Sequence, residues 1–166
     1  MEVTLVPLRS GSYEDFVAAR SRSLFTTAYL LTGNLPDAED LLQGALVKLY
    51  ARWPRVSQAD SPEAYARRML VNAFVSSRRP ARFRRERLVH SPPDAVSRDP
   101  SPDDRLALWP LVRALPPRQR AVVVLRYYEG LSEREIADTL QIAPGTVKST
   151  ASAALAALRQ SLGERA

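Results

Sequence analysis

Eight arginines lie between Arg67 and Arg87, a segment of 21 residues that contains a single acid. This segment carries a local charge of +7, whereas the whole chain carries +6, so the remaining residues are close to neutral. Arginine donates hydrogen bonds from a planar fork that fits two phosphate oxygens, and it also stacks on bases. A concentrated basic segment therefore attracts a polyanion, either a nucleic acid or an anionic membrane surface. A solvated charged face or a basic linker is the ordinary alternative.

Residues for catalysis or metal binding are scarce. The chain has no cysteine, and its one histidine, His90, lies in a stretch rich in proline, serine and arginine. The sequence contains no glycine-rich phosphate loop, no nucleophile elbow and no pair of histidines at metal-binding spacing. It therefore predicts that the chain is not an enzyme and uses no cofactor, metal or small-molecule substrate. The lack of cysteine fits a reducing cytoplasm, and no apolar run is long enough for membrane insertion.

The N-terminal part of the chain contains start and stop signals for three helices. A first helix from Tyr13 should end at Gly33-Asn34, and a second should run from about Pro36 to Trp53. Ser61-Pro62-Glu63 combines a cap with a first-turn proline and opens a third helix through at least Ser77. The residues expected on the apolar faces of the first two helices are Phe16, Ala19, Leu24, Ala28, Leu31, Leu41, Leu42, Ala45, Leu46, Leu49 and Tyr50. The third helix should bury Ala64, Tyr65, Met69, Leu70, Ala73 and Phe74.

The sequence of the C-terminal part also predicts helices and no strands. One helix should lead from a cap at Ser101 to Leu115, and another from Arg118 to Tyr128, with Gly130 as its stop. Ser132 and Glu135 form a capping box that starts a short helix to Leu140. After a four-residue break, a longer helix should run from about Pro144 to Leu162.

The last two helices have the pattern of a helix-turn-helix. Ala137 is small enough for a close crossing, and Ile136, Leu140, Ile142, Val147 and Leu155 supply a shared apolar core. In this motif the second helix enters the major groove of DNA. A plain helical hairpin within a bundle is the alternative.

A proline-rich segment divides the chain into two parts. We predict an all-α fold of two small helical domains joined by a flexible linker, with the helix-turn-helix in the second. The predicted boundaries are an N-terminal extension at 1–11, a first domain at 12–80, a linker at 81–102 and a second domain at 103–163.

The motifs in both domains resemble those of extracytoplasmic-function sigma factors, the promoter-recognition subunits of bacterial RNA polymerase. LPPRQRAVVVLRYYEGLSEREIADTLQIAPGTVKS resembles region 4 of that family. LPDAEDLLQGALVKLYARW resembles region 2.2, and SPEAYARRMLVNAFVSSRR resembles regions 2.3 and 2.4. Order and spacing agree over about residues 12–162, and the segments AYLLTGN and RW–SPEAY resemble the SigE-like group common in actinobacteria.

The resemblance implies a role for three sets of residues. The set implied to bind core polymerase is Asp37, Glu39, Asp40, Leu41 and Gln43. The set implied to bind the −10 element is Arg67, Arg68, Asn72, Arg78, Arg79 and Arg82, with the arginines on phosphates and Asn72 on a base edge. The set implied to bind the −35 element is Arg134, Thr146, Lys148, Ser149, Thr150 and Ser152. The implied partners are core RNA polymerase and promoter DNA, with an anti-sigma factor as a further candidate.

Several positions depart from the family pattern. Gly44 lies in a helix interior where relatives often have glutamate, Ser76 stands where relatives often have an acid, and Ala143 replaces the usual serine cap. The segment from Leu131 onward has equal numbers of acids and bases, so the second domain alone should bind DNA poorly. We therefore expect negligible promoter binding by the free protein, with core polymerase fixing the distance between two weak DNA contacts.

Two other functions fit parts of the sequence. A freestanding helix-turn-helix transcriptional regulator would need a dimer to match two half-sites, and no dimerisation domain is evident. A protein-interaction module with an RNA-binding arginine tail is the other alternative.

Overall fold

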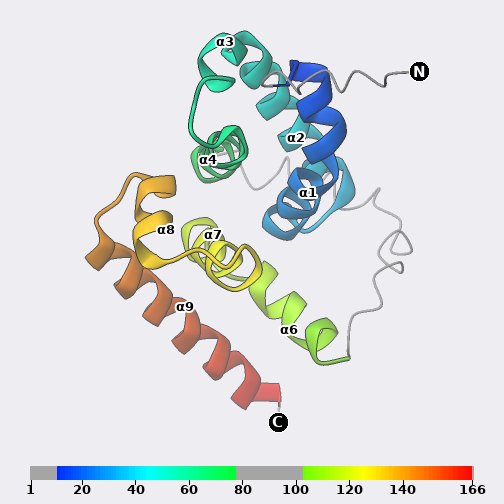
Figure 1. The fold of residues 1–166 in the computed structure, drawn as a ribbon. Helices are drawn as coiled ribbons and strands as arrows, with labels where there is room; N and C mark the ends of the chain where they lie inside the picture. The colour runs from blue at the N-terminus through cyan, green and yellow to red at the C-terminus, as the bar shows by residue number, and fades with distance from the viewer. Residues whose placement is uncertain (1–10, 78–102, 166) are drawn as a thin grey trace, which may run out of the picture.

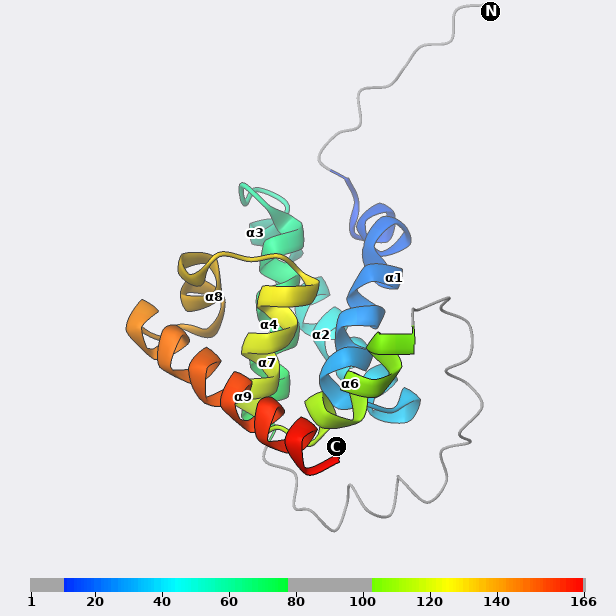
Figure 2. The same cartoon turned by 90° about the horizontal axis from the view of Figure 1, so that it is seen from below.

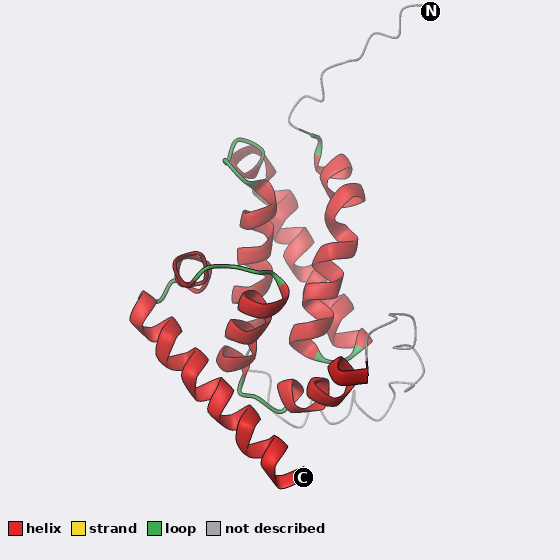
Figure 3. Ribbon diagram, turned by 60° about the horizontal axis from the view of Figure 1, so that its bottom comes forward, coloured by secondary structure: helices red, strands yellow, loops and turns green. Residues whose placement is uncertain are grey.

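The computed structural model describes residues 11–77 and 103–165, and every regular element within these residues is a helix. Figure 3 shows this all-helical architecture. The helices are α1 (Tyr13–Thr32), α2 (Leu35–Ala51), α3 (Trp53–Val56), α4 (Pro62–Ser76), α6 (Asp103–Arg113), α7 (Pro117–Val123), the π-helical turn η2 (Val124–Tyr128), α8 (Glu133–Leu140) and α9 (Pro144–Arg165). The all-α prediction with two helical domains is confirmed. The predicted linker at 81–102 lies outside the described residues.

The N-terminal domain consists of α1 to α4, which pack around an apolar core contributed mainly by α1, α2 and α4. The α1–α2 junction follows the predicted stop signal. Gly33 adopts a left-handed conformation with φ of 83°, and its N–H donates to the carbonyl of Tyr29 at 2.8 Å. Asn34 then caps α2, because its Oδ1 accepts from the backbone N–H of Asp37 at 2.9 Å. Local signals thus fix the turn that sets α2 against α1.

Several predicted core positions in this domain are wrong. Ala19 is exposed, because the buried residues of α1 lie further along the helix, from Leu24 to Leu31. Tyr50 is 63% exposed, and its ring meets Tyr13 edge-on at the outer end of α2. On α4 the fully buried positions include Ala66 and Val71, which the sequence analysis did not select, whereas Ala64, Tyr65, Met69 and Ala73 are only partly buried.

The C-terminal domain is built around α7. Six consecutive residues from Arg120 to Leu125 are buried, as in a helix surrounded by neighbours. The predicted regular helix up to Tyr128 is wrong at its end. The α-helix stops at Val123 and continues as the π-helical turn η2, in which the N–H of Glu129 donates to the carbonyl of Val124 at 3.1 Å.

The two domains pack against each other through α4. Figures 1 and 2 show α4 beside α7 and α8, and α6 across the end of α1. Leu31, Val71 and Phe74 of the N-terminal domain share one apolar cluster with residues of α7, η2, α8 and α9. The main members of this cluster from the C-terminal domain are Val122, Leu125, Ile136, Leu140 and Val147. The core is therefore continuous across the domain boundary.

Candidate nucleic-acid interface

Three of the residues predicted to contact the −10 element lie on α4. Arg68 is exposed, while Arg67 and Asn72 are partly buried. The other three predicted contacts, Arg78, Arg79 and Arg82, lie outside the described residues. Phe74 is buried in the cluster shared by the two domains, and Trp53 and Tyr65 pack against the core of the N-terminal domain.

Arg67 faces the C-terminal domain and binds an acid there. Its Nη1 lies 3.5 Å from Oε2 of Glu129, and both side chains are largely buried, with 17% and 19% exposure. The other carboxylate oxygen of Glu129 accepts a hydrogen bond from the hydroxyl of Thr27 on α1 at 2.5 Å. Thr27 is 1% exposed. One carboxylate from the C-terminal domain is thus held by two helices of the N-terminal domain.

Asn72 also binds the C-terminal domain. Its Nδ2 donates to the backbone carbonyl of Thr139 on α8 at 2.9 Å. Val71 and Phe74, on the same helix, are buried in the cluster shared by the two domains. We call Arg67, Val71, Asn72 and Phe74 the α4 contact face. In this structure the C-terminal domain covers that face.

Arg120 forms a third connection between the domains, which the sequence did not predict. It is 9% exposed, and its Nη1 donates to the carbonyl of Leu31 at the end of α1 at 2.6 Å. Its Nη2 donates to the carbonyls of Arg113 and Leu115 at 2.7 and 3.0 Å. The guanidinium also lies 5.6 Å from the ring centre of Phe74. The signal that was available was an arginine directly adjoining the apolar run AVVVL, where a buried charge needs several acceptors.

The role of Glu129 could not be predicted for a different reason. Glu129 follows η2, and its hydrogen bond to Val124 spans one residue more than in an α-helix. The extra residue rotates the chain after η2 relative to a regular helix. A regular helical pattern could therefore not indicate where the Glu129 carboxylate points.

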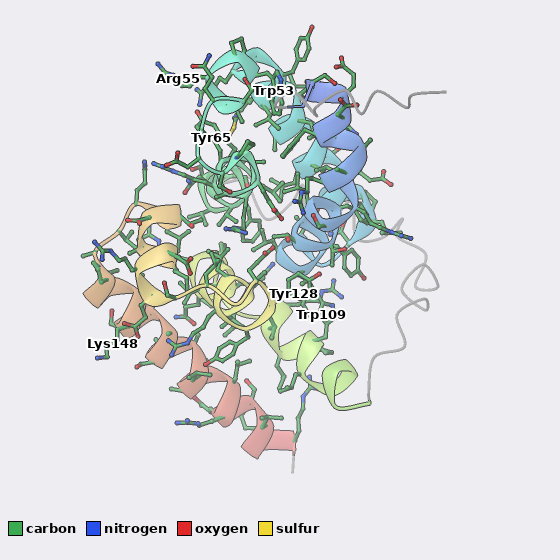
Figure 4. All side chains as sticks on the ribbon, viewed as in Figure 1. Trp53, Arg55, Tyr65, Trp109, Tyr128 and Lys148 are labelled. Atoms are coloured by element: carbon green, nitrogen blue, oxygen red, sulfur yellow. The ribbon has the colours of Figure 1, made fainter. Side chains whose placement is uncertain are left out.

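The predicted −35 residues lie mainly on one outward side of α9. Thr146, Lys148, Ser149 and Ser152 are exposed, and Thr150 is partly buried. Val147, Ala151 and Ala154 occupy the opposite, buried side. Figure 4 shows Lys148 pointing away from the rest of the molecule. Arg134 on α8 is exposed as well.

Local hydrogen bonds and one left-handed residue define the two ends of α8 and the start of α9. The capping box at α8 is confirmed: Ser132 Oγ accepts from the N–H of Glu135 at 3.2 Å, and Glu135 Oε2 accepts from the N–H of Ser132 at 2.7 Å. The hydrogen bond from the Ser132 N–H to the carboxylate, with a smaller contribution from the Ser132 hydroxyl, lowers the pKa of Glu135. α8 ends at Gln141, which adopts a left-handed conformation with φ of 55°. Ala143, which lacks a capping hydroxyl, accepts from Thr146 and Val147 through its carbonyl.

The residues predicted to bind polymerase lie along α2. Glu39, Asp40 and Gln43 are exposed. Asp37 has a structural role, since its Oδ2 accepts from Nδ2 of Asn34 at 2.9 Å while its N–H donates to the same side chain. Leu41 is partly buried and packs against both larger apolar clusters.

The outer side of α2 also exposes apolar surface. Val47 is 67% exposed and Tyr50 is 63% exposed. A Cβ atom added at Gly44 would have no neighbour within 4 Å. This side of α2 therefore combines acids, a glycine and two large apolar side chains.

Among the described residues, no cluster of three or more His, Cys, Asp or Glu side chains has the arrangement of a metal site. None of the helices in the described ranges has the length and apolarity that a bilayer crossing needs.

Comparison with known families matches both domains. Residues 16–84 match the family described as sigma-70 region 2, and residues 105–158 match sigma-70, region 4. The RNA polymerase sigma-E factor of Streptomyces avermitilis is 39% identical over 92% of this chain and 86% of its own length. The ECF RNA polymerase sigma factor SigL of Mycobacterium tuberculosis is 34% identical over 95% of this chain and 90% of its own length.

Two solved structures share the fold. The sigma factor RpoE from Bartonella quintana, in complex with the anti-sigma factor NepR, aligns with a TM-score of 0.66 at 24% identity, over 91% of this chain and 96% of that chain. CnrH, in complex with the cytosolic domain of CnrY, aligns with a TM-score of 0.60 at 20% identity, over 95% and 94%. Two family matches in the expected order and relatives above 30% identity over nearly the full length agree with the helical geometry, and the chain therefore belongs to the extracytoplasmic-function sigma factors of RNA polymerase.

Proposed function

We propose that this sigma factor binds core RNA polymerase through α2, contacts the −10 element with α4 and the arginines that follow it, and contacts the −35 element with α9. Bound in this way, it directs transcription initiation in the cytoplasm. The proposed units are the extension 1–11, region 2 at 12–80, the linker 81–102 and region 4 at 103–163. An anti-sigma factor is a candidate partner, because the related RpoE was crystallised with one.

The observation that carries the −35 assignment is the two-sided character of α9. Its buried side, Val147, Ala151 and Ala154, packs on the domain, while four polar side chains face outward: Thr146, Lys148, Ser149 and Ser152. A helix held from behind with a free polar face can enter the major groove. Hydroxyl and lysine side chains there can donate to base edges and phosphates.

The −10 assignment relies on charge and on donor chemistry. Arg68 is exposed on α4, and the basic segment continues beyond the helix in the sequence. Asn72 offers both a donor and an acceptor, which an adenine edge requires. Single-stranded DNA is bound by cations along the backbone together with apolar or aromatic surface for the bases.

The polymerase assignment relies on the outer side of α2. Exposed acids at Glu39 and Asp40 lie on the same helix as Val47 and Tyr50, which are exposed to solvent in the free chain. An apolar patch with a polar rim is typical of a protein-binding surface.

Run-off transcription tests the proposal. Purified bacterial core polymerase should produce a specific transcript from the DNA upstream of the gene for this chain only when the chain is added. Lys148→Ala should reduce the yield, since it removes a charge from the outward face of α9. Arg159→Ala is the matched control, because Arg159 is exposed on the same helix about 16 Å further along. A transcript pattern that does not depend on the chain would refute the function.

A further inference from the structure

An anion site beside the α4 contact face is filled from within the molecule. Arg67 of α4 and Thr27 of α1 both hold the carboxylate of Glu129, which belongs to the C-terminal domain. We propose that Thr27 and Arg67 form a binding site for a backbone phosphate of promoter DNA, and that Glu129 occupies this site until the two domains separate. This inference rests on the proposed function, in which α4 contacts the −10 element.

The chemistry of the site fits a phosphate. A guanidinium binds carboxylate and phosphate in the same way, through N–H donors directed at two oxygens. The hydroxyl of Thr27 adds a neutral donor from a second helix, at 2.5 Å from the bound oxygen. Both donors belong to the N-terminal domain, so the site remains assembled when the C-terminal domain moves away.

Departure of Glu129 with its domain leaves the Thr27–Arg67 site open to another anion. Arg67 is 17% exposed and Thr27 is 1% exposed when Glu129 is bound. These values hold with the C-terminal domain packed on this face, so its departure exposes both donors to an approaching anion. A DNA phosphate is such an anion. The same site can therefore hold either Glu129 or DNA, but not both.

The neighbouring contacts exclude DNA from the same face. One N–H of Asn72 Nδ2 is bonded to the carbonyl of Thr139, which holds the side chain against α8 and takes that N–H from a base edge. Val71 and Phe74 are covered by the C-terminal domain. By contrast, Thr146, Lys148 and Ser149 of α9 remain exposed. While the two domains are packed together, the α4 contact face is therefore covered, whereas the predicted −35 contacts on α9 remain accessible.

One substitution distinguishes the occupation of the site by Glu129 from a general effect of removing a negative charge. Glu129→Gln keeps the shape of the side chain and removes its charge. Glu133→Gln is the matched control: it removes the same charge from a residue that pairs with Arg126 of its own domain at 3.6 Å. We expect Glu129→Gln to bind a fluorescent single-stranded, A+T-rich oligonucleotide about tenfold more tightly than the wild type, as loss of about 1.4 kcal/mol of competing interaction would produce. Equal affinities for the Glu129→Gln and Glu133→Gln proteins would overturn the proposal.

A second variant tests the phosphate site itself. Adding Thr27→Val to Glu129→Gln keeps the side-chain volume and removes the hydroxyl donor. We expect the double variant to bind the oligonucleotide about threefold more weakly than Glu129→Gln alone, which is the effect of losing one hydrogen bond. An unchanged affinity would show that Thr27 does not contact phosphate. These measurements use the free chain, so they stand apart from the run-off assay, in which failure of the wild type would refute the sigma-factor role instead.

A crosslink tests the exclusion of DNA without altering the anion site. The chain has no cysteine, so Thr32→Cys and Arg113→Cys introduce the only thiols. Thr32 adjoins Gly33, where an added Cβ would lie 2.5 Å from Nε of Arg113 in the other domain. Joining the two thiols with a reducible reagent should abolish run-off transcription, and reduction should restore it. A crosslinked protein that initiates as well as its reduced form would contradict the proposal.

Discussion

Replacing Arg120 should destabilise the protein more than replacing any other arginine of α7. Its guanidinium donates to three backbone carbonyls at 2.6, 2.7 and 3.0 Å, two in its own domain and one at Leu31 in the other. Each hydrogen bond from a charged donor contributes about 1.5–3 kcal/mol, but such values are not additive. Replacing Arg120 leaves buried carbonyls without this donor, and each group that stays unsatisfied costs about 1–3 kcal/mol. We therefore expect Arg120→Ala to lower the free energy of unfolding by about 3–5 kcal/mol.

Thermal unfolding followed by circular dichroism measures this change. For a chain of this size, 1 kcal/mol corresponds to about 2–4 °C in Tm, so the midpoint should fall by about 10 °C. Arg120→Lys should lose a smaller amount, because one ammonium cannot span carbonyls on two sides. Arg118→Ala is the control: Arg118 is exposed on the same helix, and its loss should change stability by less than about 0.5 kcal/mol. Equal midpoints for Arg120→Ala and Arg118→Ala would show that the three hydrogen bonds of Arg120 do not stabilise the fold.

Three further predictions concern single positions. Gln141→Gly should stabilise the chain by about 0.5–1 kcal/mol in urea unfolding, because glycine adopts the left-handed conformation at φ of 55° without steric cost; a loss of stability would contradict this. Gly44→Ala should raise the free energy of unfolding by up to about 1 kcal/mol, since a Cβ there meets nothing within 4 Å, and a simultaneous loss of affinity for core polymerase would show that the partner packs against Gly44. The native hydrogen bonds of Glu135 lower its pKa below the ordinary value of 4.5, so its charge stabilises the fold above pH 4.5 and this contribution disappears as pH falls through the lower native pKa. Urea unfolding across this range should show the wild type losing its advantage over Glu135→Gln, whereas a constant difference would exclude the effect.

Local features of the fold could be predicted from the sequence because they depend on nearby residues. The stop at Gly33, the cap at Asn34 and the capping box of Ser132 and Glu135 each involve partners within four residues. The outward position of Lys148 and the buried position of Val147 follow from helical spacing once the start of α9 is known.

The contacts between the domains could not be predicted in this way. Glu129 lies 102 residues from Thr27 and 62 residues from Arg67, and a segment of proline-rich sequence separates the two domains. Val71 and Phe74 are apolar, so their identity is equally compatible with burial inside the N-terminal domain and with burial against the other domain. The rotation introduced by η2 and the three acceptors of Arg120 arise only from tertiary packing.

We infer that the α4 contact face binds the C-terminal domain in the free chain and promoter DNA after core polymerase has separated the domains. Energy transfer between dyes on Gln58→Cys and Gln160→Cys, two exposed positions in different domains, measures this separation directly. Transfer should be efficient in the free chain and should fall when core polymerase is added, before any DNA is present. Unchanged transfer in a complex that is competent for run-off transcription would show that the domains need not separate for initiation.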